Sequence, residues 1–417
     1  MSERASSWFS SLRLQYLLAY ACATGADWLQ GPHVYALYES YGLKTKDISS
    51  LFVAGFGSSL ALGTVVASYG DKIGRKKICL LYGILYGASC LTKHSSDYWI
   101  LFVGRILAGI ATSILLTSFE AWLVSEAHNK KGLEENYLTT VLTQAQQING
   151  VAAILAGGIA QVAASHFGFV APFDLAIFFL IATTVIVGKT WSEPPSSQTT
   201  DTSFFQNGWR VLFEDRDVLL LGLIQGLFEG SMYIFILEWT PMLSQKDNPT
   251  DPTPNIPHGY IFSGFMTSVF VGSSIFGLLT KKIASLETIL LSVIAISAAS
   301  FFVVIFFPPN FWRNFGALLV FEACIGIFWP CIGSLRARML PDGCRSTLMN
   351  FFRIPVNVVI IVVLLQDYPL LTNFLACAVM LVIAVVLQTL IVLRRRPAHA
   401  SVHYLHEPLL SVPEEQI

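Results

Sequence analysis

The sequence predicts an all-α membrane protein with twelve transmembrane helices arranged as two pseudo-symmetric six-helix bundles. Three observations support this prediction. Of the 417 residues, 54% are hydrophobic and only 13% are charged, which is more apolar surface than a soluble protein can cover. Apolar runs of about 20 residues, long enough to cross a bilayer core, occur twelve times. A linker rich in Pro, Ser and Thr interrupts them after the sixth run.

The predicted spans divide the chain into four parts. They are residues 14–37, 50–69, 77–95, 98–121, 139–161, 169–189, 217–240, 259–280, 284–307, 313–335, 346–367 and 369–393. Residues 1–190 form the N-terminal bundle, 191–215 a cytoplasmic linker, 216–396 the C-terminal bundle and 397–417 a polar tail that we expect to be disordered. A basic turn follows both the second and the eighth span, which indicates an internal repeat.

Lys and Arg residues indicate the orientation of the spans, because short cytoplasmic loops carry an excess of them. With the N-terminus inside, 5 of the 26 Lys and Arg residues fall in outer segments and 2 within spans. The remaining 19 lie in inner segments. We therefore expect a multi-pass protein in the lipid bilayer with both termini in the cytoplasm.

Composition and motifs exclude several functional classes. A net charge of −1 argues against nucleic acid as a partner, since that would require clustered basic surface. The chain has no GxxxxGK[ST] motif for ATP-driven pumping, and its 7 cysteines lack metal-ligand spacing. We expect no enzyme activity, no cofactor, no metal and a monomer. The N-terminus lacks the successive features of a cleavable signal peptide.

Polar side chains inside the spans are the candidate substrate-binding groups, because such groups are costly at membrane depth. Asn350, Arg353 and Asn357 stand at i−3, i and i+4, so a helix places them on one face. Gln144 and Gln147 are paired at i+3 on the fifth span. Converging donors of this kind suit an oxyanion. The alternative role for Arg353 is an internal ion pair with an acid of another span.

Arg105 is the other arginine inside a span, and Gly109 follows it by one helical turn. The glycine leaves space beside the guanidinium for a ligand or for a close partner helix. Guanidinium groups match oxyanions in a way that ammonium groups do not. We therefore interpret Arg105 as substrate-binding, with a structural ion pair to a neighbouring acid as the alternative.

Asp27, Glu229 and Glu322 are acids inside the spans. Asp27 on the first span and Glu229 on the seventh occupy matching places in the two bundles. Carboxyl groups held beside arginines in a membrane can bind and release protons between two conformations. We predict that these three acids couple transport to protons, although Glu322 would also fit a neutral, hydrogen-bonded role.

The turn YGDKIGRKKICLL (69–81) places five charged residues between two apolar spans. Its run DKIGRKK resembles the signature between helices 2 and 3 of the major facilitator superfamily. The resemblance implies the fold of that superfamily and a gate at the cytoplasmic helix ends. We expect Asp71 and Arg75 to form this gate, with Arg75 reaching an acid such as Glu120 or Glu126. A simple positive-inside anchor is the alternative.

Further runs are similar to the eukaryotic molybdate-anion transporter family of that superfamily. They are ADWLQ (26–30), VGR (103–105), FEAW (119–122), VAPF (170–173), IQGLFE (224–229), WTP (239–241) and FRIP (352–355). The resemblance implies a secondary active transporter that takes up molybdate by alternating access in the plasma membrane. Some relatives can carry an additional hydrophobic segment before the first helix; we expect this departure to leave the twelve-helix core unchanged.

Two other functions stay open. The first is transport of another anion, such as sulfate, phosphate, nitrate or an organic anion, because molybdate and sulfate share charge and shape. The second is a non-transporting membrane receptor or scaffold with the same fold. In that protein the buried charges would form closed structural pairs.

Overall fold

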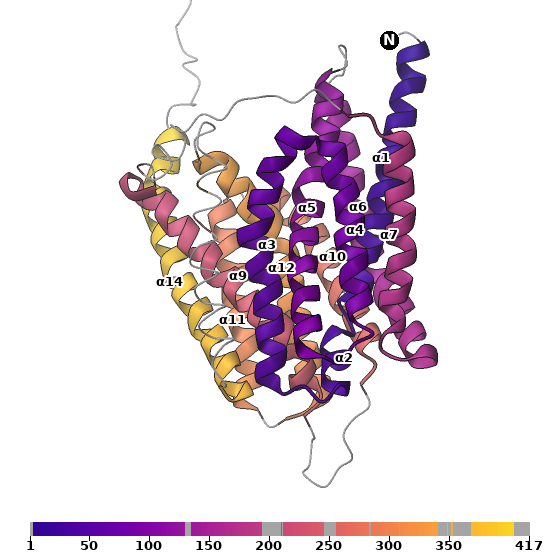
Figure 1. Ribbon diagram of the computed structural model, residues 1–417. Helices are drawn as coiled ribbons and strands as arrows, with labels where there is room; N and C mark the ends of the chain where they lie inside the picture. Colours follow the sequence, from indigo (N-terminus) through magenta and orange to yellow (C-terminus); the bar gives the residue numbers. More distant parts are fainter. Residues whose placement is uncertain are drawn as a thin grey trace, which may run out of the picture.

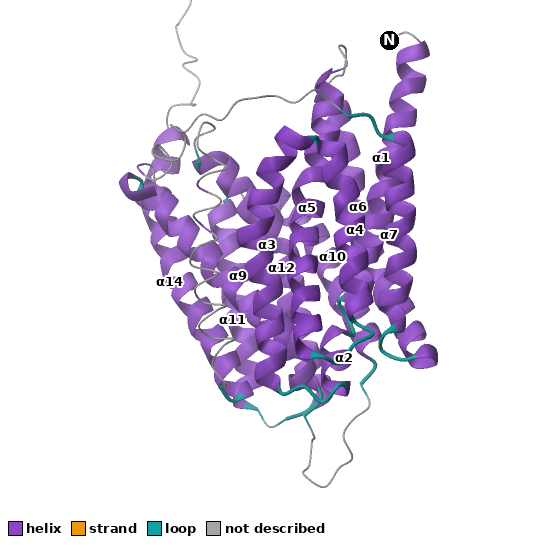
Figure 2. Cartoon of the chain, in the orientation of Figure 1, coloured by secondary structure: helices purple, strands orange, loops and turns teal. Residues whose placement is uncertain are grey.

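The structure is a computed structural model, and it describes residues 3–129, 135–193, 210, 212–245, 256–282, 285–307, 309–340, 348, 352 and 368–403. Long helices run side by side through the molecule (Figure 1). No strand occurs among the described residues (Figure 2). The all-helical class predicted from the sequence is confirmed.

The described helices account for all but one of the predicted spans. They are α1 (Glu3–Gln30), α2 (Val34–Ser40), α3 (Thr45–Ile73), α4 (Arg75–Thr92), α5 (Tyr98–Asn129), α6 (Glu135–Phe167), α7 (Ala171–Thr190), α9 (Arg216–Leu243), α10 (His258–Lys282), α11 (Leu286–Phe306), α12 (Phe311–Met339) and α14 (Leu370–His403). The predicted span 346–367 lies outside the described residues apart from Leu348 and Phe352.

The surface of the helices is suited to lipid. Within the described residues, α5, α6, α7, α9, α10, α11, α12 and α14 are long and apolar enough to cross a membrane. Large apolar side chains point outward from them, including Phe178 at 70% exposure and Phe306 at 73%. Water would penalise so much exposed apolar surface, whereas lipid tails solvate it. The molecule is therefore a multi-pass membrane protein.

The helices form two bundles that repeat one packing scheme. In the first bundle, α5 packs against α3 and α4, and α7 packs against α1 and α4. In the second bundle, α12 packs against α10 and α11, and α14 packs against α9 and α11. The helices α1, α3, α4, α5 and α7 thus correspond in order to α9, α10, α11, α12 and α14. Both bundles use the same helix pairs to bury their apolar faces.

Glycines permit the closest helix contacts at matching places in the two bundles. A Cβ on Gly109 of α5 would lie 2.1 Å from the carbonyl oxygen of Gly55 on α3. A Cβ on Gly326 of α12 would lie 2.1 Å from the carbonyl oxygen of Val269 on α10. Small residues at such crossings let backbones approach and pack, as is common between membrane helices. Gly109 therefore admits a partner helix, which was one of its two predicted roles.

The end of the first predicted span, 14–37, is wrong. α1 stops at Gln30, and the turn Gly31-Pro32-His33 leads into α2. Proline lacks a backbone N–H and clashes with the preceding helical turn. The apolar character nevertheless continues into α2, which is why hydropathy alone joined the two helices. His33 directly precedes α2, and α2 lies at the end of the molecule opposite the N-terminus (Figure 1).

Candidate functional site

Asp27 is the centre of a polar cluster in the first bundle. The Tyr86 hydroxyl on α4 donates a hydrogen bond of 2.5 Å to Asp27 Oδ1. The Thr112 side chain on α5 forms another hydrogen bond with this carboxylate, and the charge of Arg105 acts on it. Sequence analysis predicted Asp27 and Arg105 but missed the two hydroxyl groups. No spacing relates them to Asp27, because three separate helices supply the cluster.

Arg105 is half-buried beside α3 and has no carboxylate oxygen within 4.0 Å among the described residues. Its Nε donates to the Leu51 carbonyl oxygen at 3.3 Å, and its guanidinium carbon lies 4.8 Å from the centre of the Phe52 ring. Gly55 makes room for the guanidinium, since a Cβ there would lie 2.8 Å from Arg105 Nη2. A guanidinium carries five N–H donors. In this part of the chain, Arg105 therefore keeps donors and charge for a ligand.

The amide groups of α6 differ in their engagement. Asn149 Oδ1 accepts a hydrogen bond of 2.8 Å from Trp28 Nε1 on α1. Gln144 is half-buried, and its Oε1 is buried without a hydrogen-bond partner among the described residues. Gln147 is exposed. The two predicted glutamines are therefore the available amides, whereas Asn149 holds the first helix.

Glu229 lies near the middle of α9. Its side chain is 5% exposed, and its Oε1 accepts a hydrogen bond of 2.7 Å from Gln225 Nε2. Gln225 Oε1 in turn accepts one of 3.2 Å from Arg336 Nη1 on α12. Each bundle thus relates an acid on its first helix to an arginine on its fourth. The predicted span 313–335 ends just before Arg336, and Gln225 was noted only as part of the run IQGLFE, although it precedes Glu229 by one helical turn.

Glu322 on α12 is buried at 5% exposure. The neighbouring Phe321 packs against Phe301, with ring centres 4.4 Å apart, and against Phe228 at 6.1 Å. Among the described residues, the carboxyl group has no hydrogen bond and no ion pair. The hydrogen-bonded role considered for Glu322 therefore finds no partner in this part of the chain.

The predicted face of Asn350, Arg353 and Asn357 lies outside the described residues. Its role in substrate binding stays a prediction from the sequence. The structure therefore documents the candidate binding groups of the first bundle only.

The predicted gate is described in part. Arg75 Nη1 donates a hydrogen bond of 2.6 Å to the Ala121 carbonyl oxygen on α5. Glu120, the residue before Ala121, is exposed, and no ion pair joins it to Arg75 among the described residues. Asp71 lies on α3, but its side chain is outside what the structure describes. Arg75 therefore ties α4 to the backbone of α5 instead of to the Glu120 carboxylate.

The basic turn also ties α4 to the end of α7. Glu193 Oε1 accepts a hydrogen bond of 3.2 Å from the Lys76 backbone N–H, and Lys76 Nζ donates to the Trp191 carbonyl oxygen at 2.7 Å. Gly74 has a φ of +119°, and a Cβ there would lie 2.5 Å from the Glu193 carboxyl carbon. Glycine is therefore required on both counts. Glu193 was missed because it lies far away in the sequence.

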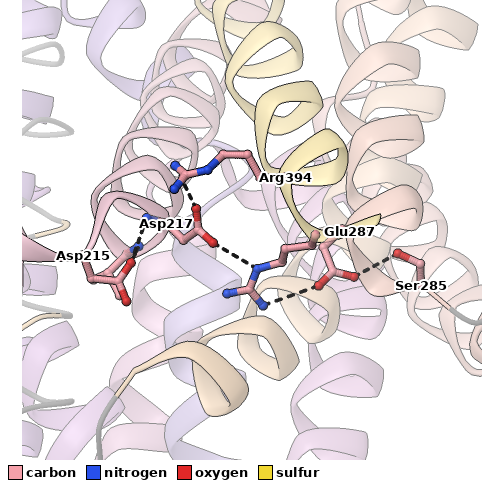
Figure 3. Close-up of polar contacts among 7 residues, drawn as sticks. Asp215, Asp217, Ser285, Glu287 and Arg394 are labelled. Atoms are coloured by element: carbon pink, nitrogen blue, oxygen red, sulfur yellow. Dashed lines mark hydrogen bonds and ion pairs between the residues drawn. The ribbon is translucent and has the colours of Figure 1, made fainter. Parts of the chain in front are cut away.

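An ion-pair cluster holds the corresponding end of the second bundle (Figure 3). The Asp217 carboxylate on α9 lies 3.2 Å from Arg394 Nη1 and 3.2 Å from Arg395 Nε on α14. Arg395 Nη1 lies 3.8 Å from Glu287 Oε1 on α11, and Ser285 Oγ donates to Glu287 at 2.9 Å. The cluster joins three helices and so ties this end of the second bundle together.

The two bundles meet along α6 and α10, and we call this contact the α6–α10 seam. A Cβ on Gly259 would lie 2.3 Å from the Gly157 carbonyl oxygen, so the two backbones touch. The Ser263 hydroxyl donates to the Ile154 carbonyl oxygen at 2.8 Å, and the Gly259 N–H donates to Gln161 Oε1 at 2.8 Å. The seam lies toward the end that carries α2, away from the N-terminus (Figure 1).

Known proteins resemble this chain along most of its length. Residues 2–327 match the family model described as sugar transporters with 12 transmembrane segments. A molybdate-anion transporter of Xenopus tropicalis is 34% identical over 390 residues, which cover 90% of this chain and 84% of the relative. A molybdate-anion transporter of Takifugu rubripes is 31% identical over 381 residues, with 84% and 78% covered.

Solved transporter structures share the fold. The nucleoside transporter NupG superposes with a TM-score of 0.69 at 14% identity and covers 93% of this chain and 99% of its own. An auto-inhibited POT family peptide transporter gives a TM-score of 0.71 at 11% identity, with 92% and 97% covered. Such low identities show the fold alone. Together with the extensive sequence matches, they establish that this chain belongs to the molybdate-anion transporter family of the major facilitator superfamily.

Proposed function

We propose that this protein is a secondary active transporter that takes up molybdate by alternating access between its two bundles. The name of its relatives supports molybdate as the substrate. The observation that carries the proposal is the Arg105 guanidinium, which is half-buried and has no carboxylate within 4.0 Å in the described part of the chain. A desolvated, unpaired guanidinium is a strong site for an oxyanion.

The substrate-binding set combines groups of both bundles. Gln144 and Gln147 on α6 add amide donors to the charge of Arg105. On sequence grounds, the face centred on Arg353 supplies the corresponding donors from the second bundle. An anion held by both bundles is bound most tightly when they close around it, and this differential affinity drives the change of conformation.

Uptake of a dianion requires coupling to another ion. One elementary charge moved against 100 mV costs about 2.3 kcal/mol, so a dianion that enters a negative cytoplasm costs about twice as much. Asp27, Glu229 and Glu322 are the groups that we assign to proton coupling. Asp27 on α1 lies in the field of Arg105, and Glu229 on α9 accepts a hydrogen bond from Gln225. Glu322 on α12 is buried without a partner in the described part of the chain. These surroundings support the role in proton coupling.

We place the protein in the plasma membrane as a monomer, with both termini in the cytoplasm. The excess of Lys and Arg in inner segments supports the orientation. With this orientation, the α6–α10 seam closes the outer side. We also assign Asp71, Arg75 and Glu120 to a gate on the inner side, as the resemblance of the turn 69–81 implies.

Molybdate uptake by cells that express this chain tests the proposal. We expect uptake above that of control cells, and excess sulfate tests the selectivity between two anions of the same charge and shape. Complete competition by sulfate would instead assign sulfate as a substrate. Cells with normal amounts of the protein in the membrane and no uptake of either anion would refute the transport function.

Variants of Arg105 test the observation that carries the proposal. Arg105→Lys keeps the charge but loses the planar fork, and Arg105→Gln loses both, so we expect uptake to fall at least tenfold with either. Membrane abundance is measured in parallel by surface labelling. Normal uptake by both variants would remove Arg105 from the substrate-binding site.

A further inference from the structure

Two histidines from different bundles face each other at the end of the molecule that carries α2. His33 lies in the turn between α1 and α2, and His258 begins α10. Their ring centres are 5.8 Å apart, and His33 is 1% exposed. Aromatic rings flank the pair, with Phe169 6.0 Å from His33 and Trp239 5.9 Å from His258. His33 is therefore shielded from water, whereas His258 is half-buried.

The histidine pair is part of the α6–α10 seam. The Gln161 side chain lies beside the His33 ring, and Gln161 Oε1 accepts the Gly259 N–H at 2.8 Å. Gly259 follows His258 directly, so Gln161 links the two histidines across the bundle boundary. Separation of α6 from α10 would break this link and expose both rings.

Among the described residues, no carboxylate oxygen lies within 4.0 Å of a ring nitrogen of His33 or His258. His258 is the titratable group whose charge acts on His33, and other groups of the neighbouring elements are engaged elsewhere. Glu39 of α2 and Glu238 of α9 act on Tyr35. Asp174 of α7 is paired with His94 at 2.8 Å.

One ring nitrogen of His33 has no partner. Nδ1 of His33 is buried without a hydrogen bond among the described residues. Protonation of this atom in the closed seam would create a buried N–H donor without an acceptor, which costs free energy. The closed seam therefore favours neutral His33, whereas an open seam would let water solvate either form.

We propose that His33 and His258 form a proton-binding site that opens the α6–α10 seam when protons bind. Protonation puts two positive charges at ring distance in an interface that buries His33, and their repulsion is relieved when the bundles separate. Under the proposed orientation the protons come from outside the cell. The inference rests on the proposed function in two respects only: the compartment that supplies the protons, and the substrate that enters through the open seam.

The pKa of His33 determines whether acid opens or closes the α6–α10 seam. Burial, followed by the charge of His258, lowers the pKa of His33 from its ordinary 6.5 to about 4. Exposure to water in the open seam returns the pKa toward the ordinary value. Protons therefore bind the open form better, and acidification favours it. For one ring with these two values, a change from about pH 7.5 to about pH 5 raises the open-to-closed ratio by about 30-fold.

Distance measurements between spin labels test the site without any transport assay. Phe167 at the end of α6 is 83% exposed, and Tyr260 at the start of α10 is 57% exposed. Labels on Phe167→Cys and Tyr260→Cys report the separation of the bundles by double electron–electron resonance in lipid nanodiscs. The chain without these two cysteines gives the background from the native ones.

We expect the longer-distance population to grow as the pH is lowered from about 7.5 to about 5. His33→Gln combined with His258→Gln should abolish this growth. His94→Gln, which removes an exposed histidine of the same end, should retain it. If the double variant does not fold, each single variant removes the mutual repulsion and should reduce the response.

A response that persists in the double variant, or no response in the unsubstituted chain, would overturn the inference. Molybdate uptake into liposomes separates this result from the proposed function. A pH-dependent distance in a protein that takes up no molybdate would support the proton site and reject the proposed substrate.

Discussion

The substitution Gly157→Ala tests whether the α6–α10 seam closes one side of the transporter. A Cβ at Gly157 would lie 2.6 Å from the Gly259 carbonyl oxygen and 2.4 Å from Ser263 Oγ. Ordinary van der Waals contact begins at 3.4 Å. The hydroxyl can rotate away, but the carbonyl belongs to the backbone of α10. The two helices must therefore move apart by about 0.8 Å at this point.

This clash has a predictable size. Extra methyl groups in packed interiors cost about 1–3 kcal/mol. The cost falls on the closed seam alone, so it raises the open-to-closed ratio by about 5-fold to 150-fold at about 1.4 kcal/mol per factor of ten. The gain in helix propensity from Gly to Ala, about 1 kcal/mol, applies to both conformations and cancels.

The neighbouring glycine supplies a matched control. Gly158 is also helical, and a Cβ there would meet nothing within 4 Å. Gly158→Ala should therefore leave the seam closed. Both variants are measured at neutral pH with spin labels on Phe167→Cys and Tyr260→Cys.

The expected result is a population at longer distance in Gly157→Ala that is absent in Gly158→Ala. Equal distance distributions in the two variants would refute the reasoning. That result would mean that the seam adapts to the methyl group without opening, or that it does not hold the bundles together.

Three further predictions follow from single contacts. Gly55→Ala puts a Cβ 2.8 Å from Arg105 Nη2, so molybdate binding to the purified protein should weaken at least tenfold. The control Gly57→Ala, whose Cβ meets nothing within 4 Å, should bind molybdate normally. Equal affinities of the two variants would contradict the assignment of Arg105. Asp217→Asn removes the carboxylate charge that faces two arginines at 3.2 Å and should lower the stability of the protein by about 1 kcal/mol. The assay is the melting temperature in detergent, which should fall. An unchanged melting temperature would show that the ion-pair cluster contributes nothing to stability. Because the pKa of His33 is lowered to about 4 in the closed form, molybdate uptake should rise as external pH falls from about 7 to about 5. If His33→Gln leaves the pH profile of uptake unchanged, His33 is not the proton-binding group.

Some features of this protein are local properties of the chain, and these could be predicted. Apolar length determines whether a segment can cross a bilayer, and the structure has a helix in every predicted span that it describes. The motifs that resemble molybdate-anion transporters also lie within short runs, and the matches to known proteins confirm the family. A polar residue inside an apolar run is visible without a structure, which identified Asp27, Arg105 and Glu229 as candidates.

The partners of those residues were decided only by tertiary structure. Tyr86, Thr112 and Gly55 reach Asp27 or Arg105 from other helices, and His33 meets His258 across two bundles. Hydropathy specifies how long a helix is and leaves open how it is rotated and which helix it touches. Those choices depend on side-chain packing between segments that are far apart in the sequence. The chain alone therefore determined the family, the helices and the buried charges, whereas the packing of the helices decided which groups surround those charges and where the two bundles touch.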